Sequence, residues 1–187
     1  MNYADWHIPL SHGDLTLREA LDSLSAVGAR QQEIPLVVRL LENPKYKLPG
    51  VTLFHGAADL KVHDRIHILL GRGLLMEDEA FTIGFTMGST KRVRRSEEWL
   101  FGQLARRIYP HPYRFNDDAV RIYYDAVRLG GISGCRPLNR IDYDRYIDTP
   151  LREIRSQAGL ETDLLTACYR IEMERYPGST ASQRLLD

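Results

Sequence analysis

Apolar side chains recur at helical spacing along most of the chain. Leu17, Leu21 and Leu24 fall on one face of a helix, and Thr16 and Glu19 at its start have the spacing of a capping box. In that motif each of the two side chains accepts a hydrogen bond from a backbone N–H that the helix leaves free. The pattern therefore predicts an amphipathic helix from about residue 16 to residue 28.

Caps and helix breakers predict further helices. Ser96 and Asn116 each precede two acidic residues, which favour the positive end of a helix dipole, and Thr149 precedes a proline suited to a first helical turn. The segment Val51–Phe54 is the only stretch that suggests a strand, and it is short. The predicted helices lie at about 16–28, 34–41, 60–70, 74–87, 96–110, 116–130, 149–159 and 162–176.

These elements predict one all-α domain, a bundle of seven or eight helices over residues 1–177. A chain of 187 residues buries roughly 70% of the surface that it exposes when unfolded, so it needs no disulfide or metal to hold its core together. The remaining residues, 178–187, are mostly polar and follow a proline. We therefore expect them to form a frayed C-terminal tail.

The charge balance narrows the class of protein. The chain carries 25 Lys and Arg against 25 Asp and Glu, so it lacks the basic excess that is typical of a nucleic-acid-binding protein. Its apolar runs at 34–41 and 66–70 are far shorter than the ~20 residues of a membrane-spanning helix, and its N-terminus does not resemble a signal peptide.

We expect Cys135 and Cys168 to be buried thiols of a reducing, cytoplasmic compartment, with one disulfide as the alternative.

One histidine pair carries the clearest candidate chemistry. His63 and His67 are four residues apart and so lie on one helix face, with Asp64 about 60° beyond His67 around the axis. Leu60 and Leu70 fall on the same face, which indicates that this face points inward. Buried polar groups need hydrogen-bonding or ionic partners, and three such groups in one cluster need a partner that all of them can use.

Glu79 can complete a set of metal ligands. If the chain reverses at Gly73, midway between His67 and Glu79, an antiparallel helix pair brings Glu79 opposite His67. Leu75 and Ile83 place Glu79 on an apolar face as well. Two imidazoles with nearby carboxylates suit one divalent metal ion, with zinc favoured and iron, manganese or magnesium as alternatives. Such an interior site keeps a position open for water or substrate, which is typical of a catalytic metal.

Two other interpretations of these residues stay open. Without a metal, Asp64 could simply hold one histidine charged in a buried ion pair. The dipeptide His63-Asp64 also names the HD-type metal-dependent phosphohydrolases, which need a further histidine upstream and a further aspartate downstream. His55 and either Asp117 or Asp118 are the candidates for those two positions.

The spacing of the motif resembles that of a known family. His63-Asp64-x-x-His67, eleven further residues and then Glu79 match, at all four positions, the metal-ligand pattern of the ubiquinone (coenzyme Q) biosynthesis family known as Coq-four. The segment Ile68–Gly71 follows the histidines as it does in family members. The spacing of these four residues is the specific part of the resemblance.

A second part of the chain is similar to the same family, and two positions depart from it. The segments 141–144 and 150–155 look like the family's Trp/Tyr-acid segment and the Pro-Leu-x-Glu-Leu-Arg segment that follows it, so the resemblance spans about residues 49–160. Asp78 stands where family members often have a small residue, and Thr86–Thr90 replaces a Gln-Thr-Gly-Leu-Pro-like stretch. The chain thus looks like a divergent bacterial relative.

The resemblance implies a fold, a site and an activity. The fold would be all-α, with one divalent ion held by His63, Asp64, His67 and Glu79 as the catalytic residues, beside a pocket for a polyprenyl chain. Asp64 would be either a ligand or the acceptor that orients a histidine. The implied activity lies in ubiquinone synthesis, where a polyprenylated benzoate exchanges its ring carboxylate for a hydroxyl with the metal as a Lewis acid. A prenyl-lipid-binding scaffold without catalysis is the alternative.

The residues after the motif suggest a lipid contact. Apolar side chains face most directions of the predicted helix at 74–87, which suits either a central core helix or one wall of a cavity. We expect a cytoplasmic protein in which the basic residues after this helix form a solvated helix start, with peripheral contact to the inner face of the cell membrane as the alternative. Its expected partners are a polyprenylated aromatic substrate or prenyl lipid, other quinone-biosynthesis enzymes and a second copy in a homodimer. The basic residues that could meet lipid headgroups are Lys91, Arg92, Arg94 and Arg95.

Overall fold

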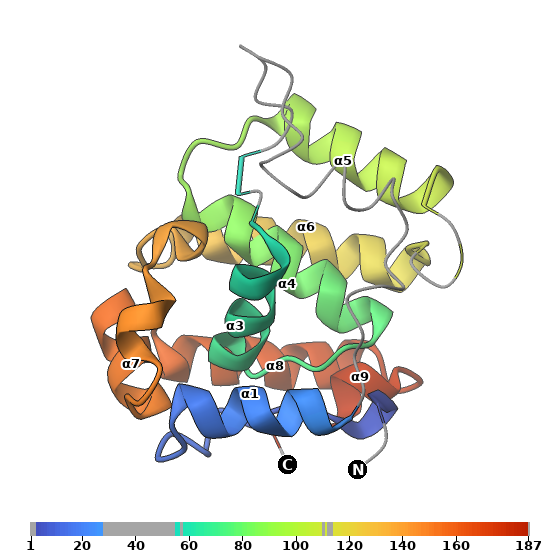
Figure 1. Ribbon diagram of the computed structural model, residues 1–187. Coiled ribbons are helices and arrows are strands. Elements are labelled where there is room, and N and C mark those ends of the chain that lie inside the picture. The colour runs from blue at the N-terminus through green and yellow to red at the C-terminus, as the bar shows by residue number, and fades with distance from the viewer. Residues whose placement is uncertain (1–2, 28–54, 57, 110, 112–113, 187) are drawn as a thin grey trace.

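Helices account for all regular secondary structure in the part of the chain that the computed structural model describes, residues 3–27, 55–56, 58–109, 111 and 114–186 (Figure 1). The prediction of an all-α fold is confirmed. The predicted helix at 34–41 and the strand candidate at 51–54 lie outside the described residues. The eight described α-helices are α1 (Leu17–Ala26), α3 (Leu60–Leu70), α4 (Met76–Ser89), α5 (Arg95–Arg107), α6 (Asp117–Ile132), α7 (Leu151–Ala158), α8 (Thr162–Arg175) and α9 (Thr180–Gln183).

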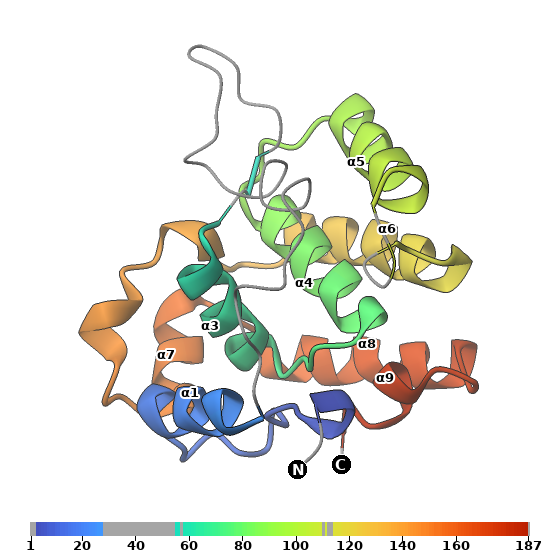
Figure 2. The same ribbon diagram turned by 45° about the vertical axis from the view of Figure 1, so that its right-hand side comes forward.

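Helix α4 lies at the centre of the bundle. Its side chains from Ala80 to Ser89 are all buried, so the helix is a core element, one of the two interpretations that its sequence allows. Helix α6 runs alongside it (Figures 1 and 2). The two backbones approach closely at Gly84 and Gly88 of α4 and at Gly130 of α6. A Cβ atom at any of these three positions would collide with a backbone carbonyl of the other helix.

The turn between α3 and α4 begins with a glycine in the left-handed region. Gly71 has a φ of 71°, a conformation that costs glycine little, and it ends α3. The buried guanidinium of Arg155 in α7 donates hydrogen bonds of 2.9 and 3.2 Å to the carbonyls of Leu69 and Ile68. Burial lowers the pKa of Arg155 to about 10, so the group is still a cation at neutral pH. Its charge faces the negative end of the α3 dipole and stabilises that end.

The C-terminal segment is packed against the domain, so the prediction of a frayed tail at 178–187 is wrong for residues 178–186. Ser179 caps the short helix α9 by accepting a hydrogen bond from the Ser182 backbone N–H. Ala181 and Leu185 are fully buried, which gives the segment an apolar anchor that its polar composition concealed. Helix α9 packs on α4 and lies beside the first turn of the described chain, η1 (Tyr3–Asp5) (Figure 2).

Helix α5 differs from its prediction in its start and leaves part of its apolar surface exposed. It begins at Arg95 without a side-chain cap, so the expected cap at Ser96 is wrong. Leu100 in the helix and Ile108 at its end are 42% and 54% exposed. Phe101 takes the inner position because its ring stacks on Tyr123 of α6 at a centroid distance of 5.2 Å. The caps expected for α1 and α6 are confirmed, including the capping box of α1.

Both cysteines of the chain are free thiols. Cys135 is a buried free thiol as expected, whereas Cys168 is free but only partly buried, so the alternative of a disulfide is wrong. Burial raises the pKa of both thiols. Within the described ranges, none of the helices is long and apolar enough to cross a membrane.

Candidate metal centre

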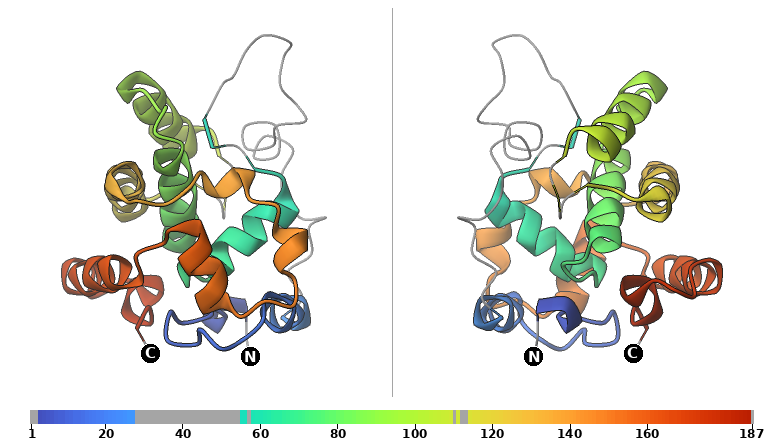
Figure 3. Two further views of the ribbon diagram at one scale, coloured as in Figure 1. Left: turned by 90° about the vertical axis from the view of Figure 1, so that its left-hand side faces the viewer. Right: turned by 90° about the vertical axis from the view of Figure 1, so that its right-hand side faces the viewer.

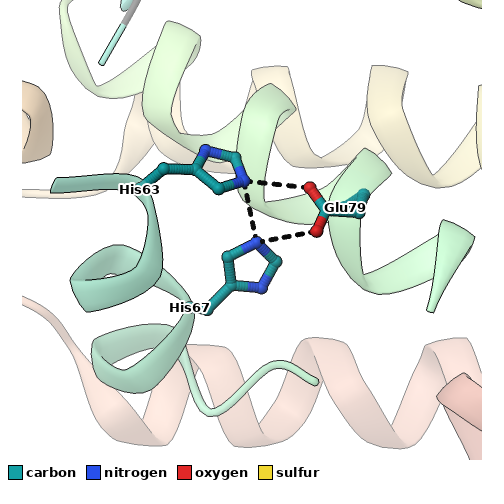
Figure 4. A group of neighbouring side chains, drawn as sticks. All are labelled: His63, His67 and Glu79. Atoms are coloured by element: carbon teal, nitrogen blue, oxygen red, sulfur yellow. Dashed lines mark hydrogen bonds and ion pairs between the residues drawn. The ribbon is translucent and has the colours of Figure 1, made fainter. Parts of the chain in front are cut away.

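The site lies where α3 and the first turns of α4 come side by side (Figure 3). Asp59 caps α3 by accepting a hydrogen bond of 2.9 Å from the Val62 backbone N–H, which sets the start of the helix. Helix α3 then presents His63 and His67 on successive turns toward α4. Glu79, in the first turn of α4, faces them from the opposite side (Figure 4). The reversal between His67 and Glu79 that the sequence suggested is thus present.

The three side chains meet through their polar atoms. Nε2 of His63 lies 2.9 Å from Nε2 of His67 and 2.9 Å from Oε2 of Glu79. Nε2 of His67 lies 3.3 Å from Oε1 of the same carboxylate. Each of the three residues thus offers one ligand atom, and these three atoms all lie within 4.8 Å of one another. No other group of three or more His, Cys, Asp or Glu with this property occurs among the described residues.

These separations fit the ligand atoms of one metal ion. A divalent ion such as zinc binds imidazole nitrogen and carboxylate oxygen at about 2.0–2.2 Å, so neighbouring ligand atoms stand about 3 Å apart. Both histidines present Nε2, the atom with a free lone pair when the other ring nitrogen carries the hydrogen. The donor set of two imidazoles and one carboxylate therefore fits a divalent ion in both chemistry and spacing.

Burial and charge give the site a strong preference for an ionised carboxylate. The side chain of His67 is 1% exposed, that of His63 17% and that of Glu79 29%, so solvent reaches the site from the Glu79 side. Burial raises the pKa of Glu79, but the two imidazoles beside it outweigh that effect and hold the pKa well below its ordinary value. The carboxylate is consequently in its ligating form throughout the physiological range.

Asp64, the fourth predicted site residue, lies beside the cluster but is not part of it. Among the described residues, the group whose ligand atoms converge consists of His63, His67 and Glu79. Burial raises the pKa of Asp64, the charge of Glu79 adds to that effect, and both histidines oppose it. Asp64 is therefore within electrostatic reach of all three ligands.

Thr82 is a site residue that the sequence motif did not reveal. It lies on α4 three residues after Glu79, is fully buried, and places its Oγ1 3.3 Å from Nδ1 of His67. A helix brings residues three apart onto the same face, so the spacing Glu79-x-x-Thr82 was the available signal.

Two buried ion pairs fix the position of the start of α4. Asp78 is fully buried, accepts a 3.1 Å hydrogen bond from the Leu75 backbone N–H and pairs with Arg184. Arg72, also fully buried, makes two hydrogen bonds of 2.8 and 2.6 Å to the carboxylate of Glu172 in α8. The guanidinium of Arg72 also stacks over the rings of Phe81 and Tyr169. These contacts fix the turn from which Glu79 projects.

The residues that would complete an HD-type phosphohydrolase site are engaged elsewhere. Nδ1 of His55 lies 2.8 Å from Oε2 of Glu97 in α5. Asp117 and Asp118 form ion pairs with arginines at the surface, at 2.6 and 3.4 Å respectively. None of the three belongs to the cluster around His67.

The basic residues after α4 and the cavities of the described chain do not converge on the candidate metal centre. Lys91 donates hydrogen bonds to three carbonyls at the C-terminal end of α6, so its charge is used within the fold, whereas Arg92, Arg94 and Arg95 are exposed. A cavity of about 170 Å³ between α4, α6 and α8 is lined in part by Phe81. A larger one, of about 810 Å³, opens between α7, α8 and the N-terminal segment. Neither is lined by the three ligands.

Comparisons with family models, with curated proteins and with solved structures found no match to this chain.

Proposed function

We propose that this protein is a metal-dependent enzyme whose single divalent ion is held by His63, His67 and Glu79. The observation that carries the proposal is the convergence of two Nε2 atoms and one carboxylate within 4.8 Å at a largely buried site. Burying two imidazoles and a carboxylate away from water is costly unless they share a partner, and a metal ion is the partner that uses all three.

The number of ligands argues for a catalytic ion. Structural zinc sites are closed by four protein ligands, whereas catalytic sites have three and leave a position for water or substrate. Sets of two histidines and one carboxylate occur in zinc hydrolases and in non-haem iron enzymes. Zinc remains the favoured ion, with iron and manganese as alternatives, because two nitrogen ligands make magnesium the least suitable of the four.

For the reaction, we propose replacement of the ring carboxylate of a polyprenylated benzoate by a hydroxyl, as part of quinone biosynthesis. The support is the spacing of His63, Asp64, His67 and Glu79 together with the all-α fold. The conversion ArCO2H + ½ O2 → ArOH + CO2 balances with dioxygen as the oxidant, and because zinc has no redox chemistry the ion for this reaction would be iron or manganese. The bound ion supplies Lewis acidity toward the oxygens of the substrate. Glu79 and His63 border the solvent-exposed side on which the substrate arrives, and Asp64 is the nearby group that can exchange a proton.

The test begins with metal analysis of the purified protein. We expect about one divalent ion per chain, and turnover of a short-chain prenylated hydroxybenzoate to the corresponding phenol with release of CO2. Lipid that copurifies without any turnover would favour the scaffold alternative. Phosphoester hydrolysis would favour the HD-type alternative, although the engagement of His55, Asp117 and Asp118 elsewhere argues against it. Absence of stoichiometric metal from protein that was never exposed to chelators would refute the proposal.

A further inference from the structure

Thr82 stands behind the most buried of the three ligands. His67 has a side chain that is 1% exposed, and Thr82 is fully buried. The imidazole of His67 has two polar atoms in this interior. Its Nε2 faces His63 and Glu79, whereas its Nδ1 faces Oγ1 of Thr82 at 3.3 Å.

The two ring nitrogens of a neutral histidine have opposite roles. One carries a hydrogen and donates, and the other has a lone pair that can accept or bind a metal. Which nitrogen carries the hydrogen is decided by the partner that each one finds. In His67, a metal can be bound at Nε2 only if the hydrogen is on Nδ1, and a buried Nδ1–H needs an acceptor.

We propose that Thr82 is a positioning residue for the metal, whose Oγ1 accepts the hydrogen of Nδ1 of His67 and so keeps the lone pair of Nε2 directed at the ligand cluster. The inference rests on the proposed function, because it assigns Thr82 a role toward the same ion. The hydroxyls of Thr86 and Ser89, also buried in α4, donate to backbone carbonyls of the helix itself, whereas Oγ1 of Thr82 lies within reach of a histidine ring. Thr82 touches His67 and not the ion, so it acts through the ligand.

Loss of the hydroxyl should weaken metal binding without removing a ligand. In Thr82→Val the side chain keeps its shape, but Nδ1–H of His67 loses its acceptor. The ring can then place its hydrogen on Nε2, which removes the lone pair that the metal needs. Partners that orient a ligating histidine typically change metal affinity by about 10–100-fold, and we expect a loss in that range.

Thr86 provides a matched control one turn further along α4. It is also buried, and its hydroxyl donates a 2.7 Å hydrogen bond to the backbone carbonyl of Thr82 rather than to a ligand. Thr86→Val therefore removes the same atoms from the same helix without touching His67. Thr82→Ser serves as the rescue variant, because it restores an acceptor at the same position.

The experiment measures zinc affinity by competition with a chromophoric chelator, and the melting temperature of the metal-free form, for wild type and the three variants. Support consists of a 10–100-fold loss of affinity in Thr82→Val, a change of less than threefold in Thr86→Val and recovery in Thr82→Ser. Equal affinities in the two valine variants would overturn the role of Thr82 while leaving the metal proposal intact. If the wild-type protein binds none of the three metals zinc, iron and manganese, the metal proposal and this inference both fail.

Discussion

Nη2 of Arg184 donates a 2.6 Å hydrogen bond to Oδ2 of Asp78, and this contact joins the C-terminal segment to the residue next to Glu79 of the candidate metal centre. The two partners are 106 positions apart in the sequence. Arg184 also donates to the backbone carbonyl of Ala4, so the same guanidinium contacts the first described turn of the chain. Both ends of the described chain therefore support the start of α4.

Removal of Arg184 should strongly destabilise the domain. The carboxylate of Asp78 is fully buried, and Arg184→Met would leave its charge without its closest partner. Breaking a buried pair from one side typically costs about 3–5 kcal/mol in the free energy of unfolding. Urea denaturation measures this cost.

The control is Arg106→Met, which breaks a pair with Asp117 whose side chains are 49% and 65% exposed. Surface pairs of this kind contribute less than about 1 kcal/mol. A loss of under 1 kcal/mol in Arg184→Met as well would show that the buried pair does not hold the tail in place.

Substitution of the ligands should release the metal. His63→Ala, His67→Ala and Glu79→Gln each leave two of the three ligand atoms, which is too few for retention through gel filtration. We expect less than about a tenth of the wild-type metal content by elemental analysis, since loss of a single ligand removes far more affinity than loss of an outer partner. His12→Ala, at an exposed position, should retain the wild-type content. Full metal content in all three ligand variants would place the ion elsewhere.

The stability of the metal-free protein should depend on pH through Glu79. Its pKa in the fold lies below the ordinary value of 4.5, so the ionised form stabilises the native state. That contribution is fully present above about pH 4.5 and is lost as the pH falls from there toward the pKa of the folded state. Glu79→Gln should therefore be less stable than wild type at pH 6, and the difference should shrink between pH 4.5 and pH 3.

Denaturation in the presence of a chelator at several pH values measures this difference. Glu174→Gln, at an exposed position of α8, is the control and should track wild type at every pH. A gap between Glu79→Gln and wild type that widens on acidification would contradict the assignment.

The close contact of α4 and α6 predicts opposite effects for two glycines. A Cβ at Gly88 would collide with the carbonyl of Val127, whereas a Cβ at Gly131 meets nothing within 4 Å. We expect Gly88→Ala to cost at least about 1–3 kcal/mol through overpacking. Gly131→Ala should instead stabilise α6 by about 0.5–1 kcal/mol, because alanine is the better helix former. Thermal melting of both variants checks the signs.

The sequence allowed the fold class and the convergence of His63, His67 and Glu79 to be predicted because both depend on local spacing. Two histidines four residues apart share a helix face, and Glu79 needs only one chain reversal to meet them. Thr82 and Arg184 were missed for a different reason. The spacing of Thr82 from Glu79 places the two on one helix face but does not show which group the hydroxyl meets. An arginine in a polar tail is indistinguishable from a solvated one until Asp78 is known to be buried.

The outward face of α5 could not be predicted for a related reason. Its apolar residues fit a helix period on two different faces, and the choice between them depends on Tyr123, which belongs to another helix. Periodicity alone cannot rank two such faces. Stacking of Phe101 on Tyr123 does so, and it leaves Leu100 and Ile108 outside.

The 2.9 Å contact between Nε2 of His63 and Nε2 of His67 links metal uptake to acid–base exchange with the medium. Two imidazole nitrogens at this distance share one hydrogen, and an ion that takes both lone pairs must displace it into the solvent. Loading is then a competition between protons and metal for the same two atoms. The heat of binding will contain the protonation heat of the buffer, and the fraction of loaded protein in a cell will follow the supply of free metal and the local acidity together.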